Sequence, residues 1–161
     1  MKTSTQIAKY IREIHSGGNW TVSNLKEHLS DITWQQATRQ VYSLNTIATL
    51  VFHMHYYVEV ALKVLKGQPL AGSDKNSSSH PPLKSQQDWQ KMLDKMWNDA
   101  ETSAFMFEKS PDDTLWAVFA NTKYGNYYRN LHGIIEHLHY HLGQVVLIKK
   151  NLLETVHSNP K

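Results

Sequence analysis

Residues 128–150, YRNLHGIIEHLHYHLGQVVLIKK, decide the fold of this chain. The segment contains no proline, and its apolar residues recur at intervals of three and four, which predicts one long amphipathic helix. Seven residues form the apolar stripe of that helix: Leu131, Ile134, Ile135, Leu138, Leu142, Val145 and Val146. A second stripe on a neighbouring face has a different character, and its members are His137, His141, Gln144 and Ile148.

His137 and His141 are four residues apart, a spacing at which two imidazoles on one helix can hold a single metal ion. Ten histidines among 161 residues give about 0.6 such pairs by chance. The spacing alone therefore does not separate a metal site from two histidines that are hydrogen-bonded at the edge of a core. The pair needs support from the rest of the chain.

The composition predicts one globular domain, residues 1–161, that is not embedded in a membrane. Hydrophobic residues make up 40% of the chain and the mean hydropathy is -0.52. No apolar run approaches the roughly 20 residues of a membrane span, and the first 20 residues lack the apolar region and cleavage site of a signal peptide. Without cysteine there is no disulfide framework and no thiolate ligand. We expect a cytoplasmic protein.

The positive charge is small and dispersed. The formal net charge is +3, the isoelectric point is about 9.0, and Lys149 and Lys150 form the only adjacent basic pair. Proteins that bind nucleic acids usually concentrate lysine and arginine on one face, where they reach the phosphates. We therefore expect no nucleic-acid partner.

Two long helices are predicted before the final one. Residues 44–66 carry an apolar stripe, begin near a capping Asn45 and end at Gly67. A helix is predicted over residues 85–109, with Ser85 as its candidate N-terminal cap and a buried face that includes two tryptophans. The final helix is expected to end at about Leu153, with a polar tail from about residue 154 that frays.

The N-terminal part predicts shorter helices. Residues 6–15 form an amphipathic helix that two glycines stop, Ser23 is a candidate cap for a helix to Leu29, and Thr33 is a candidate cap for one that carries Trp34. The chain is therefore expected to be all-α, a four-helix bundle with extra short helices near the N-terminus.

Two long connections interrupt the helices. Residues 71–84 form a loop rich in serine and proline that is either mobile or frames a site, and residues 110–127 are either irregular or a small hairpin. Connections of this length argue against a plain up-down-up-down arrangement. His80, in the first of these loops, is expected to be solvated.

Periodicity leaves the third histidine of a metal site undecided. His53 and His55 lie on opposite flanks of the apolar stripe of helix 44–66, at similar angular distances from it. Either one could face the histidine pair of the final helix.

The run EHLHYHLGQVV, residues 136–146, resembles the signature of the DinB-like superfamily, in which a helix carries His-x-x-x-His, one further residue and Gly-Gln. His137, His141, Gly143 and Gln144 reproduce that signature. Residues 45–67, NTIATLVFHMHYYVEVALKVLKG, are similar to the family's second helix, whose histidine supplies the third ligand. His53 falls at that position, and His55 at a variable one.

The resemblance extends over nearly the whole chain, because residues 15–37, HSGGNWTVSNLKEHLSDITWQQA, are similar to one branch of the superfamily. One departure is Leu142, where many members have arginine. The resemblance implies a four-helix bundle, often a homodimer, with a divalent metal held by His53, His137 and His141. Three protein ligands leave a coordination position open, as in catalytic zinc sites, and imidazole suits both zinc and nickel.

The remaining polar residues have competing interpretations. Gln144 is either a hydrogen-bond partner of a ligand imidazole or a glutamine fixed by packing on the helix surface. Glu59 and Glu136 are candidate bases, although a solvated helix face suits both. The other histidines of the helices, His55, His132 and His139, are expected to be structural or exposed. Five tyrosines either line a pocket or belong to the core: Tyr56, Tyr57, Tyr127, Tyr128 and Tyr140.

Two classes of function follow. Members of the superfamily include zinc-dependent transferases that use low-molecular-weight thiols such as bacillithiol and mycothiol, so the resemblance implies thiol S-transfer to a small-molecule substrate, with metal-assisted hydrolysis next. The alternative is a non-catalytic metal-binding or stress-response dimer. The sequence identifies neither which residue would act as a general base nor which molecule is the substrate.

Overall fold

The computed structural model describes residues 2–157, with side chains through Glu154. Within this range the chain is all-α, as predicted: it forms seven α-helices and one 3-10 helix, and its only β-type pairing is an isolated bridge between Val118 and Asn126. The elements are α1 (Thr3–Ser16), α2 (Leu25–Leu29), α3 (Trp34–Thr38), α4 (Ile47–Leu65), α5 (Gln86–Lys109), α6 (Asp113–Trp116), η1 (Thr122–Tyr124) and α7 (Tyr127–His157).

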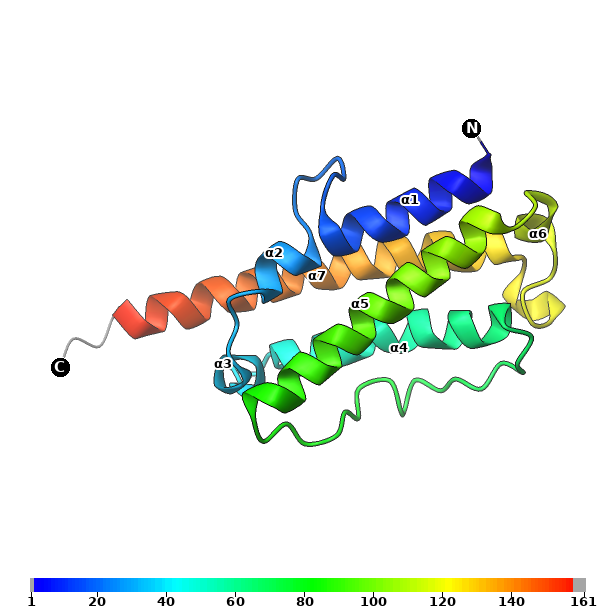
Figure 1. The fold of residues 1–161 in the computed structure, drawn as a ribbon. Helices are drawn as coiled ribbons and strands as arrows, with labels where there is room; N and C mark the ends of the chain where they lie inside the picture. Colours follow the sequence, from blue (N-terminus) through cyan, green and yellow to red (C-terminus); the bar gives the residue numbers. More distant parts are fainter. Residues whose placement is uncertain (1, 158–161) are drawn as a thin grey trace.

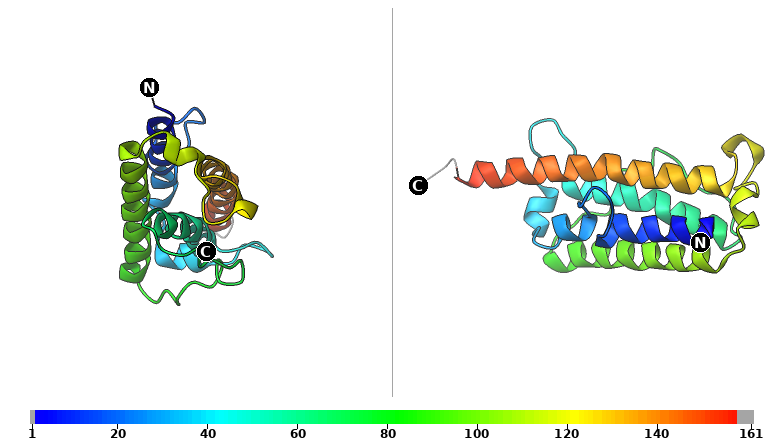
Figure 2. Two further views of the ribbon diagram at one scale, coloured as in Figure 1. Left: turned by 90° about the vertical axis from the view of Figure 1, so that its right-hand side faces the viewer. Right: turned by 90° about the horizontal axis from the view of Figure 1, so that it is seen from above.

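Four of these helices, α1, α4, α5 and α7, lie lengthwise beside one another, and an end-on view shows them at the corners of a square (Figure 2). The helices α4 and α5 run in the same direction, because both begin beside α3 (Figure 1). The backbone N–H of Trp34 at the start of α3 donates to Oε1 of Gln86 at 2.9 Å. The connection between Leu65 and Gln86 therefore returns along the length of the molecule, which explains why it is long.

The helices begin at residues whose side chains cap the first turn, but the sequence did not distinguish between two neighbouring residues that can both cap a helix. Ser85 and Thr33 cap α5 and α3 as predicted, each accepting a hydrogen bond from the third residue of its helix. The predicted caps Ser23 and Asn45 are wrong, because Asn24 and Thr46, one residue later, accept those bonds for α2 and α4. Two neighbouring residues of cap-forming type have nearly equal propensity, so the register of the first turn decides between them.

The helix α1 is longer than predicted and forms a full wall of the molecule. Its N-terminus has no side-chain cap of its own. Instead, the carboxylate of Asp112 accepts hydrogen bonds from the backbone N–H groups of Thr3 and Ser4 at 3.1 and 2.9 Å. A cap supplied from more than 100 residues away leaves no local signal, so the sequence placed the start at residue 6.

The core lies between the four long helices, and Trp89 at the start of α5 belongs to it. This side chain is fully buried, and its indole N–H donates to the carbonyl of Ile32 at 2.9 Å, which satisfies its one polar atom. Residues 110–127 form no strand hairpin: they contain α6 and η1, and one antiparallel bridge joins Val118 to Asn126. The helix α7 continues to His157 instead of ending near Leu153, and the last part of the predicted frayed tail, 158–161, lies outside the described residues.

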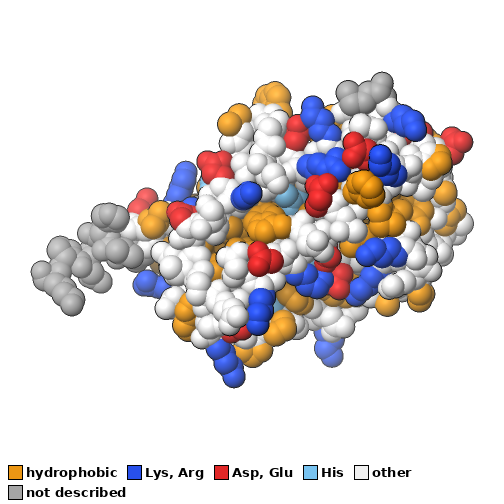
Figure 3. Space-filling model, viewed as in Figure 1, with side chains coloured by type: hydrophobic (Ala, Val, Ile, Leu, Met, Phe, Trp, Pro, Cys, Tyr) orange, Lys and Arg blue, Asp and Glu red, His pale blue; other side chains and the backbone are white. Residues whose placement is uncertain are grey.

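None of the helices within residues 2–157 is long and apolar enough to cross a membrane. On the face shown in Figure 3, basic and acidic side chains are interspersed and form no continuous basic stripe.

Candidate metal centre

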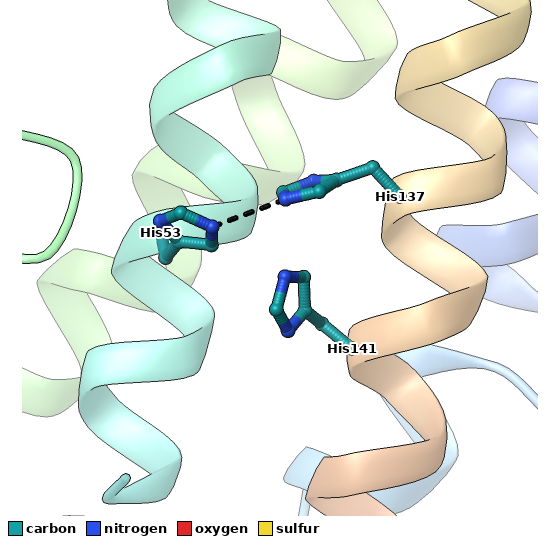
Figure 4. Close-up of side chains that lie close together, drawn as sticks. All are labelled: His53, His137 and His141. Atoms are coloured by element: carbon teal, nitrogen blue, oxygen red, sulfur yellow. Dashed lines mark hydrogen bonds between the residues drawn. The ribbon is translucent and has the colours of Figure 1, made fainter. Parts of the chain in front are cut away.

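His53, His137 and His141 meet in the space between α4 and α7 (Figure 4). His53 projects from α4, and the two other rings project toward it from successive turns of α7. One nitrogen of each residue can be chosen such that all three lie within 4.8 Å of one another. The Nε2 atoms of His53 and His137 are 3.1 Å apart, and the ring centroids of the three residues are separated by 4.4–4.9 Å.

The cluster exists because each histidine sits at the edge of a buried stripe. Next to His53, Met54 is fully buried, and next to His137 and His141, Leu138 and Leu142 are buried. Packing of these apolar neighbours brings α4 and α7 together and leaves the flanking imidazoles half-buried at the seam.

His55 belongs to a different contact, which resolves the choice that periodicity left open. Its side chain is buried toward α5, where Nε2 lies 3.3 Å from the carboxylate of Asp99 and 3.3 Å from the ammonium of Lys95. Burial, followed by the charge of Lys95, lowers the pKa of His55 to about 4. The neutral ring therefore accepts from Lys95, and its role is structural, one of the two roles that the sequence allowed.

The loop between α4 and α5 orients His53. The hydroxyl of Ser77 donates to the carbonyl of Asp74 at 2.8 Å, so its oxygen accepts from Nδ1 of His53 at 3.0 Å. The proton of His53 is thereby held on Nδ1, and the lone pair of Nε2 faces the other two histidines. The loop frames the site, as one of the two sequence interpretations held.

Gln144 orients His141 in the same manner. Its side-chain oxygen, which can only accept, lies 2.8 Å from Nδ1 of His141. The proton of His141 is held on Nδ1, and its Nε2 lone pair is left for another partner. The partner role suggested for Gln144 is therefore the one found in the structure.

The electrostatics of the cluster favour a cation. Burial, with added repulsion from His141 and His53, lowers the pKa of His137 to about 4, and burial followed by His141 lowers the pKa of His53. Both rings are therefore uncharged at neutral pH. Three imidazoles converge on one point, and imidazole nitrogens are donors that zinc and nickel prefer. With the proton of His53 on Nδ1, Nε2 of His137 donates to Nε2 of His53, so an ion bound here would take the place of that proton.

The spacing also fits a metal ion. Zinc–imidazole bonds of about 2.0–2.1 Å in a tetrahedron place two ligand nitrogens about 3.3 Å apart. The 3.1 Å separation of His53 and His137 is close to that value. The buried Nδ1 of His137 has no hydrogen-bond partner among the described residues, so this ring is the least constrained of the three.

The other candidate polar residues lie away from the cluster. Glu59 bonds to Lys63 at 2.9 Å, and Glu136 is exposed and pairs with His132 at 3.4 Å. Both thus belong to charged helix surfaces, the interpretation that the sequence favoured, and within the described residues no carboxylate joins the three histidines. His139, also on α7, bonds through Nδ1 to the carbonyl of Ile135 at 2.9 Å.

Tyrosines divide between the two roles expected for them. Tyr57 packs edge-on against both His53 and His137, with ring centroids at 5.2 and 4.9 Å, and with Tyr56 it lines a cavity. Tyr127 packs with the core, Tyr128 packs against Trp116 and Tyr140 is 66% exposed.

The sequence did not predict that Ser77 and Asp74 would take part in the site. They lie in a loop that has no hydrophobic periodicity, and only the packing of this loop against α4 brings them to His53. His80, expected to be solvated, is half-buried against Phe52, with ring centroids 6.1 Å apart, because the same loop packs along α4.

Comparison with known proteins returned nothing: no protein-family model, no curated protein and no solved structure matches this chain. Function is therefore inferred from the geometry of the site and from the residues that resemble the DinB-like signature.

Proposed function

We propose that this chain is a DinB-like four-helix-bundle protein that binds a divalent metal, zinc or nickel, through His53, His137 and His141. The observation that carries the proposal is the fixed orientation of two of these rings. Ser77 and Gln144 each accept a hydrogen bond from Nδ1, which directs the Nε2 lone pairs of His53 and His141 into the cluster, where that of His53 accepts from Nε2 of His137.

We further propose that the site is catalytic. With three protein ligands, an ion there keeps a position for a small molecule, and it supplies a Lewis acid that lowers the pKa of a coordinated thiol. Glu59 and Glu136 are engaged elsewhere, so neither supplies the base that metal-assisted hydrolysis uses. Transfer of a low-molecular-weight thiol to a small electrophile is therefore the first candidate reaction, and hydrolysis is the second.

The alternative is a non-catalytic, metal-binding homodimer. Tyr140 and Leu147, seven residues apart on α7, are 66% and 55% exposed and supply apolar surface for a second copy of the chain. A dimer is compatible with either function, so turnover distinguishes the two proposals.

Metal content tests the site directly. Elemental analysis of the untagged protein after zinc or nickel loading should give one ion per chain, and His53→Ala, His137→Ala and His141→Ala should each lose it. His132→Ala is the matched control, because it removes an exposed histidine of α7 that stacks on Tyr128 and pairs with Glu136, away from the cluster. His55→Ala is a poorer control, since it removes a buried ring that accepts a hydrogen bond from Lys95. A wild-type protein that retains no ion would end the metal proposal.

Turnover tests the enzyme proposal. Thiols and electrophiles are screened with the metal-loaded protein, and His141→Ala should abolish turnover while the helical circular dichroism stays the same. Unchanged turnover in this variant would refute catalysis at the site. A protein that binds the ion, forms a dimer and turns over none of these substrates would favour the non-catalytic alternative.

A further inference from the structure

An apolar cavity of about 390 Å³ lies beside the histidine cluster. Its walls come from α4, α7 and the segments between the helices, and they include Tyr56, Val60, Leu70, Phe119 and Ile134. A cavity of about 150 Å³ already holds benzene. This cavity therefore accommodates an aromatic ring or a branched aliphatic group with room for a short chain.

A second hollow of about 350 Å³, here called the passage, adjoins both the cavity and the cluster. It shares Tyr57, Asn130 and Ile134 with the cavity, and His137 is part of its wall. Gly133 also lines it, and a Cβ added there would meet no atom within 4 Å. The absence of a side chain at position 133 keeps this passage open on the α7 side.

Arg129 lies on the wall of the passage with an uncommitted charge. Its guanidinium forms no hydrogen bond or ion pair with any residue in the described part of the chain, whereas Arg12 binds both Glu101 and Glu108. Arg129 is exposed, and its Cδ lies beside Gly125, which has a φ of +76° and no Cβ to crowd it. An unpaired guanidinium is suited to bind a carboxylate.

Asp74 sets the direction of binding. It lies at the wall of the apolar cavity, where its Oδ1 accepts a hydrogen bond from the hydroxyl of Tyr57 at 2.9 Å. A carboxylate placed in the cavity would meet this negative charge, while one placed in the passage meets Arg129. The apolar part of a ligand therefore enters the cavity, and its acidic part stays beside α7.

We propose that this site binds a small organic acid with an aromatic or branched apolar body. The apolar body fills the cavity between Tyr56 and Phe119, the carboxylate binds Arg129, and the atoms between them pass His137. The assignment of this acid as the substrate rests on the proposed metal-dependent function. The binding site for the acid does not depend on that function.

Binding of 3-phenylpropanoate, compared with its neutral analogue 3-phenylpropanamide, tests the proposal. Calorimetry on the metal-free and the zinc-loaded protein should show the acid binding at least about tenfold more tightly than the amide, the gain expected from one charge-assisted interaction. Arg129→Met should remove this preference and leave the amide affinity unchanged. Equal affinities for acid and amide, or no binding of either at millimolar concentration, would overturn the proposal.

Gly133→Leu tests the passage, and Gly143→Leu is its control. Both glycines lie in α7 with open space around the added Cβ, so both variants should fold, and leucine should strengthen the helix by a similar amount in each. Gly133→Leu should weaken binding of both ligands at least about tenfold by filling the passage. Gly143→Leu lies outside it and should bind as the wild type. Equal binding by the two variants would refute the placement.

Zinc content, measured on the same samples, separates this inference from the metal proposal. A protein that takes up zinc and fails to discriminate the acid contradicts the organic-acid site alone. A protein that discriminates the acid and never takes up zinc supports the organic-acid site and contradicts the metal proposal.

Discussion

The hydroxyl of Ser77 offers the sharpest test of how the histidine cluster is organised. It is 1% exposed, accepts from Nδ1 of His53 at 3.0 Å and donates to the carbonyl of Asp74 at 2.8 Å. Ser77→Ala removes both bonds without adding bulk. The ring of His53 then loses the contact that holds its proton on Nδ1 and its Nε2 toward the site.

The expected loss is tenfold to a hundredfold in zinc affinity. Loss of a hydrogen-bond partner behind a metal ligand typically costs about 10–100-fold in metal binding, which corresponds to about 1.4–2.7 kcal/mol. The lower bound is close to the about 1 kcal/mol of a single neutral hydrogen bond. Competition with a chromophoric zinc chelator at pH 7 measures this affinity.

Ser79→Ala is the matched control in the same loop. Its hydroxyl is exposed and bonds to the carbonyl of Lys75 at 3.4 Å, away from the cluster, so its zinc affinity should stay within about twofold of wild type. Because Oγ of Ser78 lies 3.5 Å from Nδ1 of His53, the double variant Ser77→Ala/Ser78→Ala excludes a substitute partner. Wild-type affinity in the double variant, with helical content intact, would refute the assigned role of the loop.

Three further predictions follow from other contacts. Gln144→Glu should raise zinc affinity several-fold, because a carboxylate accepts more strongly from Nδ1 of His141 than an amide does. Gln144→Leu should lower zinc affinity about tenfold, because leucine does not accept a hydrogen bond. The same chelator competition measures both affinities, and the reverse order would contradict the prediction. Burial of His15 lowers its pKa from 6.5 to about 4, so the unfolded chain binds a proton that the folded chain does not, and the stability from this group is complete above pH 6.5 and declines by about 3 kcal/mol as the pH falls to 4. Urea unfolding at several pH values measures how the free energy of unfolding changes with pH. His15→Phe should remove the decline between pH 6.5 and 4 that this histidine causes, and an unchanged pH dependence would contradict the prediction. Val22 is 84% exposed at a φ of +52°, so Val22→Asn should stabilise the fold by about 1 kcal/mol by relieving a β-branched residue in the left-handed region, and a lowered melting temperature would argue against that strain.

The sequence predicted the parts of the structure that depend on local periodicity. The final helix, the all-α class and the caps Thr33 and Ser85 follow from spacing and propensity within single segments. His137 and His141 share a helix face for the same reason. These features need no knowledge of what packs against the segment.

Features that depend on a distant partner were not predictable in this way. His53 and His55 are equivalent by periodicity, and only Asp99 and Lys95 of α5 show why His55 turns away from the site. The resemblance to the DinB-like signature had selected His53 without supplying that reason. Asp112, which caps α1 from more than 100 residues along the chain, leaves no signal in the sequence near the residues that it caps.

The wide separation of the three histidines along the chain has a consequence for how the molecule folds. His53 and His137 are separated by 84 positions along the chain. Closing a segment of that length is entropically costly and slow compared with forming contacts within a helix. The three histidines can converge only after the N-terminal half of the chain has met α7. Retention of an ion by all three would therefore report that a purified sample has completed its fold.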